Sequence, residues 1–144
     1  MTTDIQTSLM TALYNLLTAD ATLITNCGGA VRLYPVWAKK DAAFPYLVHR
    51  IDMRHENFNP VILCTYLIDA WSYSTNATAV IAIKNRIITL LDNRDSLTTE
   101  TTNYHTWLQT ETFVPESTDD IWHYAMQFNL KWTQDSKTGT LLYR

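Results

Sequence analysis

The sequence predicts an α+β fold: a single layer of largely antiparallel, mixed sheet of about five strands, with two helices packed on one face. Three observations predict it. Two segments repeat apolar residues at helical spacing, several others are apolar or alternating over strand lengths, and the order along the chain is helix, three strands, helix, two strands. The chain has 144 residues, 47% of them hydrophobic, which is enough for one core without disulfides or metals.

The first helix begins near Thr3, which forms a capping-box pattern with Gln6. Its opposite face is polar but uncharged, which suits solvent or contact with a neighbouring subunit. Asp20 is placed to cap a further short helical turn, which Gly28 and Gly29 end because glycine tolerates the positive φ found there. The apolar residues at helical spacing are Ile5, Leu9, Ala12, Leu13, Leu16 and Leu17.

Three strands are expected next. Residues 31–34 form a short strand that Pro35 stops, because proline cannot donate to a sheet ladder. Residues 46–53 and 61–72 have similar lengths and are joined by about seven turn-prone residues, so they most simply pair as an antiparallel hairpin.

A second helix follows, with Ser74 or Thr75 as its cap. Residues 92–102 are a polar connection, and residues 104–114 form a threonine-rich strand. The last strand alternates with period two, so one of its faces lies in the core. The helix stripe is Val80, Ile83, Ile87 and Leu91, and the core-facing strand positions are Trp122, Tyr124, Met126, Phe128, Leu130 and Trp132.

The chain therefore divides into one domain, residues 1–132, and a polar C-terminal tail, residues 133–144. Two places outside the predicted core carry aromatic or large apolar side chains, and such residues favour protein interfaces because they bury large area at small entropic cost. Packing under the loop is the alternative explanation. The interface candidates are Trp37, Lys39, Lys40 and Asp41 in the loop, and Leu141, Leu142 and Tyr143 in the tail.

Composition and charge exclude several classes of protein. The net charge is −3 and the basic residues are scattered, so tight nucleic-acid binding is not expected. Residues 92–120 hold seven acidic residues against one arginine, which fits a solvated face, a surface that repels a polyanion, or one that meets a basic partner. The longest apolar runs are far too short to cross a membrane. Without a visible secretory signal, the cytoplasm is the expected site of synthesis.

Catalytic chemistry is not predicted, and no cofactor or metal is expected. The three glycines allow neither a phosphate-binding loop nor a nucleophile elbow. His55 and Glu56 are adjacent ligand types, but they fall in a hairpin connection. Asp69 interrupts an apolar strand and is either a buried carboxylate or, by alternation, an outward one. Cys27 and Cys64 are expected to be small buried hydrophobes.

Four segments occur in a familiar arrangement: residues 31–35 (VRLYP), 44–48 (FPYLV), 66–72 (YLIDAWS) and 124–132 (YAMQFNLKW), with a helix that opens at STNA directly after the third strand. In this arrangement the chain resembles the tail-completion, or tail-terminator, proteins of long-tailed bacteriophages. Two features depart from the family pattern: the loop after Pro35 is not rich in glycine or proline, and the polar tail is longer than usual.

The resemblance implies a structural, non-enzymatic virion protein that is assembled in the host cytoplasm. Its copies would close into a ring, typically a hexamer, at the head-proximal end of the tail tube, end tube growth and offer the surface for head-tail joining. Implied partners are the chain itself, the tail tube protein and a head-completion or connector protein. DNA would pass through without specific binding, and no membrane is involved.

If the ring surrounds a DNA channel, acidic residues would line the lumen or a head-facing rim, because like charge shortens the residence of phosphate on the wall. The candidates are Asp92, Asp95, Glu100, Glu116, Asp119 and Asp120.

Two other functions stay open. A small-ligand-binding cup could be lined by Trp107, Trp122 and Trp132. A small enzyme could use His55 with Glu56, or Asp69.

Overall fold

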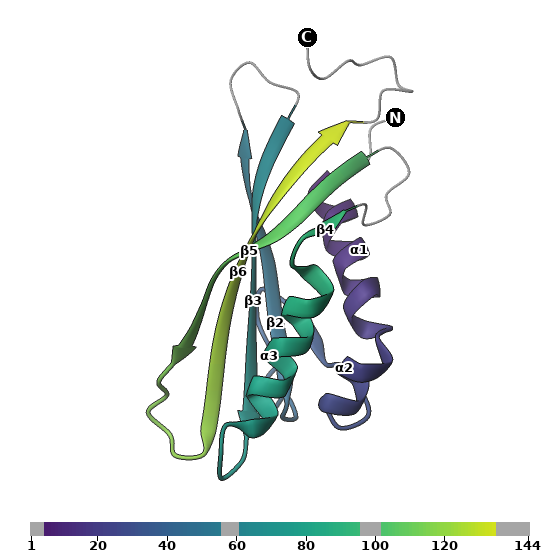
Figure 1. The fold of residues 1–144 in the computed structure, drawn as a ribbon. Coiled ribbons are helices and arrows are strands. Elements are labelled where there is room, and N and C mark those ends of the chain that lie inside the picture. Colours follow the sequence, from purple (N-terminus) through teal and green to yellow (C-terminus); the bar gives the residue numbers. More distant parts are fainter. Residues whose placement is uncertain (1–4, 56–60, 96–101, 135–144) are drawn as a thin grey trace.

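The structure, a computed structural model, describes residues 5–55, 61–95 and 102–134 (Figure 1). Within these ranges, three helices and six strands follow one another. They are α1 (Ile5–Thr18), α2 (Ala21–Asn26), β1 (Leu33–Pro35), β2 (Tyr46–His55), β3 (Val61–Tyr73), α3 (Thr78–Leu91), β4 (Arg94–Asp95), β5 (Thr102–Val114) and β6 (Ile121–Gln134).

The strands form one sheet in the order β1-β2-β3-β6-β5-β4. Only β1 and β2 are parallel, and the other neighbouring pairs are antiparallel. The helices cover one face of this sheet and leave the other face without helices (Figure 1). The predicted α+β class is thereby confirmed. The differences are small: the two-residue β4 lies within the predicted polar connection, and the short turn after Asp20 is a helix of its own.

The N-terminal prediction is confirmed where the structure describes it. Leu9, Leu13 and Leu17 of α1 are fully buried. The Asp20 carboxylate accepts the Leu23 N–H at 2.8 Å, so it caps α2 as expected. Gly28 and Gly29 have φ of 82° and 113°, the left-handed region that glycine adopts without a Cβ clash. Thr3, the predicted cap of α1, lies outside the described residues.

The predicted cap of the second long helix is wrong. The N-cap of α3 is Ala77, which offers no side-chain bond. The Thr78 N–H is instead accepted by the Asn76 side chain at 3.0 Å. Ser74 serves another element, since its N–H donates to the Asp120 carbonyl at 2.9 Å and its carbonyl accepts the Trp122 indole N–H, also at 2.9 Å. The start of α3 is thus tied to the turn before β6.

The predicted hairpin is confirmed, with β2 and β3 in an antiparallel register that runs from Tyr46 opposite Trp71 to His55 opposite Ile62. The last strand also has the predicted alternation. Met126, Phe128 and Leu130 are buried under the helices, while Trp122 and Tyr124 pack at the margin of the same core. Strand ends differ from the predicted ones by at most two residues: β1 includes Pro35, and β6 continues to Gln134.

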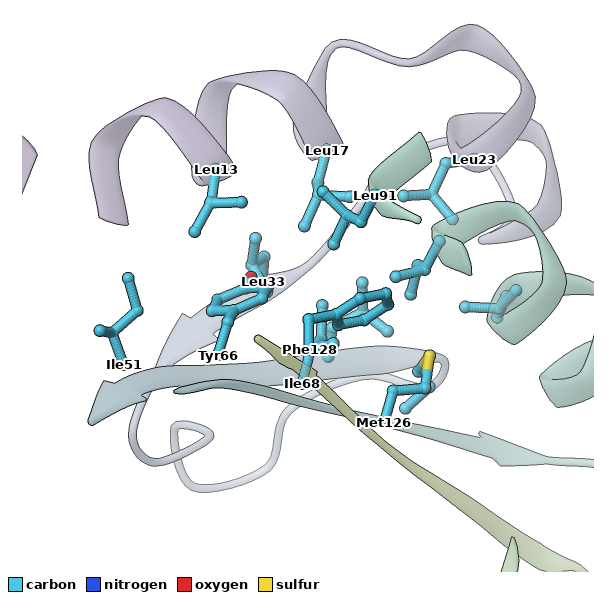
Figure 2. Close-up of a cluster of buried hydrophobic side chains, with 14 of the residues drawn as sticks. Leu13, Leu17, Leu23, Leu33, Ile51, Tyr66, Ile68, Leu91, Met126 and Phe128 are labelled. Atoms are coloured by element: carbon cyan, nitrogen blue, oxygen red, sulfur yellow. The ribbon is translucent and has the colours of Figure 1, made fainter. Parts of the chain in front are cut away.

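The core lies between the sheet and the helices. Figure 2 shows Leu13 and Leu17 of α1 pointing toward Tyr66 of β3 and Phe128 of β6, with Leu91 of α3 beside them. Each of these side chains is fully buried. Cys27 and Cys64 are buried, as predicted, and the Cys64 thiol lies 3.4 Å from the Met53 sulfur. One long-range ion pair supports this side: the Arg86 guanidinium donates to both Asp20 carboxylate oxygens, at 2.7 and 2.8 Å, and so links α3 to α2.

A β-bulge interrupts β5 between Leu108 and Thr110. Because one extra residue reverses the alternation, residues beyond the bulge face the opposite way from what the first half of the strand implies. Glu111 therefore faces the helices, where Lys84 of α3 donates to it at 2.8 Å. Phe113 faces the same side and contacts the Trp122 ring at a centroid distance of 5.6 Å.

Candidate interaction surfaces

A row of stacked rings crosses the helix-free face at one end of the sheet. Tyr46 of β2 is directly opposite Trp71 of β3, which is directly opposite His123 of β6. The Tyr46 and Trp71 rings stack with centroids 5.1 Å apart, and the Trp71 and His123 rings with centroids 4.1 Å apart. Such cross-strand pairs stabilise a sheet even where no helix covers it.

His123 is held by two carboxylates. Its Nε2 lies 2.8 Å from Asp69 of β3, and its Nδ1 lies 3.0 Å from Glu116. Both ring nitrogens face acceptors, so the protonated imidazole donates to both. Burial by itself lowers the pKa of His123, but the hydrogen bonds with Asp69 and Glu116 outweigh it, and the net pKa is raised. Asp69 does point away from the core, as its alternation predicts.

The acidic turn, residues 115–120, joins β5 to β6 and is fixed at both ends. Glu116 binds His123, and the Asp120 carbonyl accepts the Ser74 N–H. Asp120 has φ of 67°, which closes the turn. The carboxylates of Asp119 and Asp120 are exposed, and neither forms an ion pair with another residue in the described part of the chain.

The Trp37 loop, residues 36–45, joins β1 to β2 and begins with a strained turn. Val36 has φ of 63°, a conformation that costs a β-branched residue on the order of 1–3 kcal/mol. The strain is compensated by two backbone hydrogen bonds. The Val36 N–H donates to the His49 carbonyl at 2.9 Å, and the Trp37 N–H donates to the Pro35 carbonyl at 2.6 Å. The result is an indole that projects from the surface, 80% exposed, beside a half-exposed Val36.

The charged residues of this loop are also exposed. Lys39 and Lys40 make no ion pair with any described residue, and Asp41 turns the chain with φ of 63°. The Ala42 N–H donates to the Lys39 carbonyl at 3.1 Å, so the loop is held by its own backbone. The interface candidates of the tail, Leu141, Leu142 and Tyr143, lie outside the described residues.

The acidic candidates do not form one surface. Asp92 accepts the Leu108 N–H at 2.8 Å, and Asp95 lies 2.6 Å from His105, both beside β4. Glu116, Asp119 and Asp120 lie in the acidic turn, beyond the far end of β5. His105 and Val114 are nine residue steps apart along β5, a distance of about 30 Å. Glu100 lies outside the described residues.

A cleft of about 440 Å³ opens between α1 and the β1 edge of the sheet. His49 forms part of its floor and is 3% exposed, with Nδ1 2.6 Å from the Tyr66 hydroxyl. Burial lowers the pKa of His49 to about 4, so the ring is neutral at pH 7, and its Nδ1 shares one hydrogen bond with the Tyr66 hydroxyl. The other lining residues are Gln6, Thr7, Met10, Thr11, Tyr14 and Pro35.

The other sequence-predicted site residues are not brought together. Trp107 lies on the helix-free face next to His105, whereas Trp122 packs on the helix side, so these two do not line a common cup. The side chains of His55, Glu56 and Trp132 lie outside the described residues. Within residues 5–55, 61–95 and 102–134, no cluster of three His, Cys, Asp or Glu side chains could hold a metal. No helix in these ranges is long and apolar enough to span a membrane.

Comparison with known proteins gives a match of fold. No family model matches the sequence, and no curated protein matches it. Among solved structures, a chain of the virion of the native gene transfer agent (GTA) particle has the same fold, with a TM-score of 0.73 and 14% sequence identity. The match covers 91% of this chain and 98% of that chain. The whole domain is therefore similar in architecture to a virion chain.

Proposed function

We propose that this protein is a structural, non-enzymatic component of a phage-like virion. Its copies close into a ring at the head-proximal end of the tail tube. The ring ends tube polymerisation and provides the surface for head-tail joining. Its partners are further copies of itself, the tail tube protein and a head-completion or connector protein. DNA passes through the ring without specific binding.

The observation that carries the proposal is the fold match with the GTA virion chain, which extends over nearly the full length of both chains. Two features of the surface support it. The Trp37 loop presents an 80% exposed indole beside exposed charged side chains, which suits a protein contact. The titratable groups that do gather, around His123, have no nucleophile among their contacts, and both ring nitrogens are occupied by carboxylates.

Loss of the protein tests this function most directly. We expect particles assembled without it to separate into heads and tails, with tails of irregular length in electron micrographs. Intact particles with tails of normal length would contradict the proposal.

The C-terminal tail has its own role in this proposal. We infer that Leu141, Leu142 and Tyr143 dock on a neighbouring subunit. The residues around them are polar, so this segment cannot form a hydrophobic core of its own. Since β6 includes Thr133 and Gln134, the truncation to make is deletion of residues 135–144. The shortened chain is expected to fold normally and assemble more weakly. Unchanged assembly would remove this role.

The cleft beside α1 favours a second candidate function, the binding of a small apolar ligand over His49. In that case the purified protein is monomeric or dimeric and is stabilised by a ligand of this class. A protein that forms rings, and whose unfolding midpoint no such ligand shifts, contradicts it.

A further inference from the structure

The Trp37 loop and the acidic turn lie at the two ends of the same row of residues. The row runs Tyr46, Trp71, His123, Val114 across β2, β3, β6 and β5. The loop leads into Tyr46, and the turn follows Val114. Both segments are therefore at the same end of the sheet and flank β3, the loop on the β2 side and the turn on the β6 side. In Figure 1 the acidic turn is the lowest left segment of the chain.

The two segments have complementary charge. Lys39 and Lys40 against Asp41 leave the loop with a formal charge of +1. Glu116, Asp119 and Asp120 give the turn −3, or −2 when protonated His123 is counted. The lysines and the two outer aspartates have no ion partner within the described part of their own chain. An intermolecular contact would therefore pair charges that the folded monomer leaves unpaired.

Exposed apolar groups accompany the charges on both sides. The loop offers Trp37 and Val36, which are 80% and 50% exposed, and the turn has Phe113 beside it, 41% exposed. Both segments are also fixed before any contact forms, the loop by its backbone bonds and the turn by Glu116 and Asp120. A contact between preformed surfaces loses less conformational entropy than one that must order them.

We propose that the Trp37 loop of one copy docks against the acidic turn of the next copy, with Trp37 as its apolar anchor and Lys39 and Lys40 facing Asp119 and Asp120. Because the two surfaces are different, the contact is head to tail. A head-to-tail contact generates a ring when its rotation closes. This inference rests on the proposed function, for which it names the subunit contact.

A charge swap tests the contact. One variant carries Lys39→Glu and Lys40→Glu, and the other carries Asp119→Lys and Asp120→Lys; Glu116 is kept because it binds His123. Each variant alone places like charges across every contact, so we expect its self-association to weaken by about tenfold or more. An equimolar mixture offers opposite charges at every contact of an alternating ring. We expect the mixture to recover assembly in sedimentation velocity.

The control variant, Arg50→Glu with Lys131→Glu, lowers the net charge by 4, as the variant Lys39→Glu with Lys40→Glu does, at exposed positions outside both segments and should assemble as the wild type does. Trp37→Ala should weaken assembly by about tenfold or more while far-ultraviolet circular dichroism stays unchanged. If the wild type forms rings and each charge variant alone forms them as well, the proposed contact is wrong. It is also wrong if the mixture of the two variants does not recover assembly. Either result would leave the proposed function standing. A wild type that stays monomeric would overturn both.

Discussion

The two faces of the sheet each hold a partly or fully buried histidine, and the two histidines are in opposite states. On the covered face, His49 lies among apolar side chains with only the Tyr66 hydroxyl beside its Nδ1, and burial keeps its pKa low. On the helix-free face, His123 stacks on Trp71 between two carboxylates, and its pKa is raised. Among the described residues, no charged side chain contacts His49, whereas His123 is held between two carboxylates.

The difference between the two histidines indicates that the two faces of the sheet have different roles. The covered face supplies stability by burying Leu, Ile and aromatic side chains under α1 and α3. The end of the helix-free face fixes the acidic turn in place through Glu116 and the Ser74 bond. Substitutions on the covered face should therefore change folding, while substitutions in the loop and turn should change assembly.

The largest effect is expected in the core. Phe128→Ala removes a fully buried ring between the helices and the sheet and should lower the free energy of unfolding by about 3–5 kcal/mol. Trp37→Ala is the matched aromatic control on the surface and should change it by less than about 0.5 kcal/mol. Urea unfolding measures both. Similar losses for the two variants would mean that Trp37 packs as a core residue.

The pH dependence of His49 comes next. Its pKa is about 4 when folded and about 6.5 when unfolded, so the unfolded chain binds the extra proton as the pH falls through this window. Wild-type stability should fall by on the order of 2–3 kcal/mol more than that of His49→Gln between pH 6.5 and pH 4. Parallel stability profiles for the two proteins would show that His49 is not kept neutral.

The link between α2 and α3 should have a smaller effect. Asp20→Ala removes both the cap of α2 and the partner of Arg86, and we expect a loss of about 2 kcal/mol. Asp20→Asn keeps a capping oxygen and loses the charge, so it should cost about half as much. Thermal and urea unfolding compare the two. Equal losses would mean that the cap contributes nothing.

The smallest effect is expected at His123 and has the opposite sign with pH. Because its folded pKa is raised, the stability it contributes is complete below the unfolded value of about 6.5 and is lost as the pH rises through the folded pKa. His123→Gln should cost about 1 kcal/mol at pH 6 and progressively less at higher pH. A cost that grows with pH would contradict the charged state assigned to His123.

Much of the fold could be predicted because its signals are local. The stripe of α1, the alternation in β6 and the pairing of β2 with β3 each depend on one segment of sequence, and the structure confirms each prediction. The cap of α3 could not be predicted in this way, because Ser74 is bound by Asp120 and Trp122, which are far away in sequence. The β-bulge in β5 could not be predicted either, because one extra residue in a threonine-rich strand does not change its composition.

The candidate interaction surfaces could be derived from the sequence only in part. Trp37, Lys39 and Lys40 stood out because a loop flanked by prolines has no core to receive an indole. The cluster of His123 with Asp69 and Glu116 could not be predicted, since it depends on the register of β3 against β6 across 54 positions of sequence. Given that register, the alternation of β6 does place His123 opposite the core.

The proposed ring is tested most directly by the self-association of the wild-type protein, which sedimentation velocity measures. At concentrations up to about 100 μM, well above the Kd of a micromolar interface, we predict one closed oligomer whose mass is a fixed multiple of 16.6 kDa and does not grow further. A protein that remains a monomer throughout this range, or that grows without limit into filaments, would contradict it.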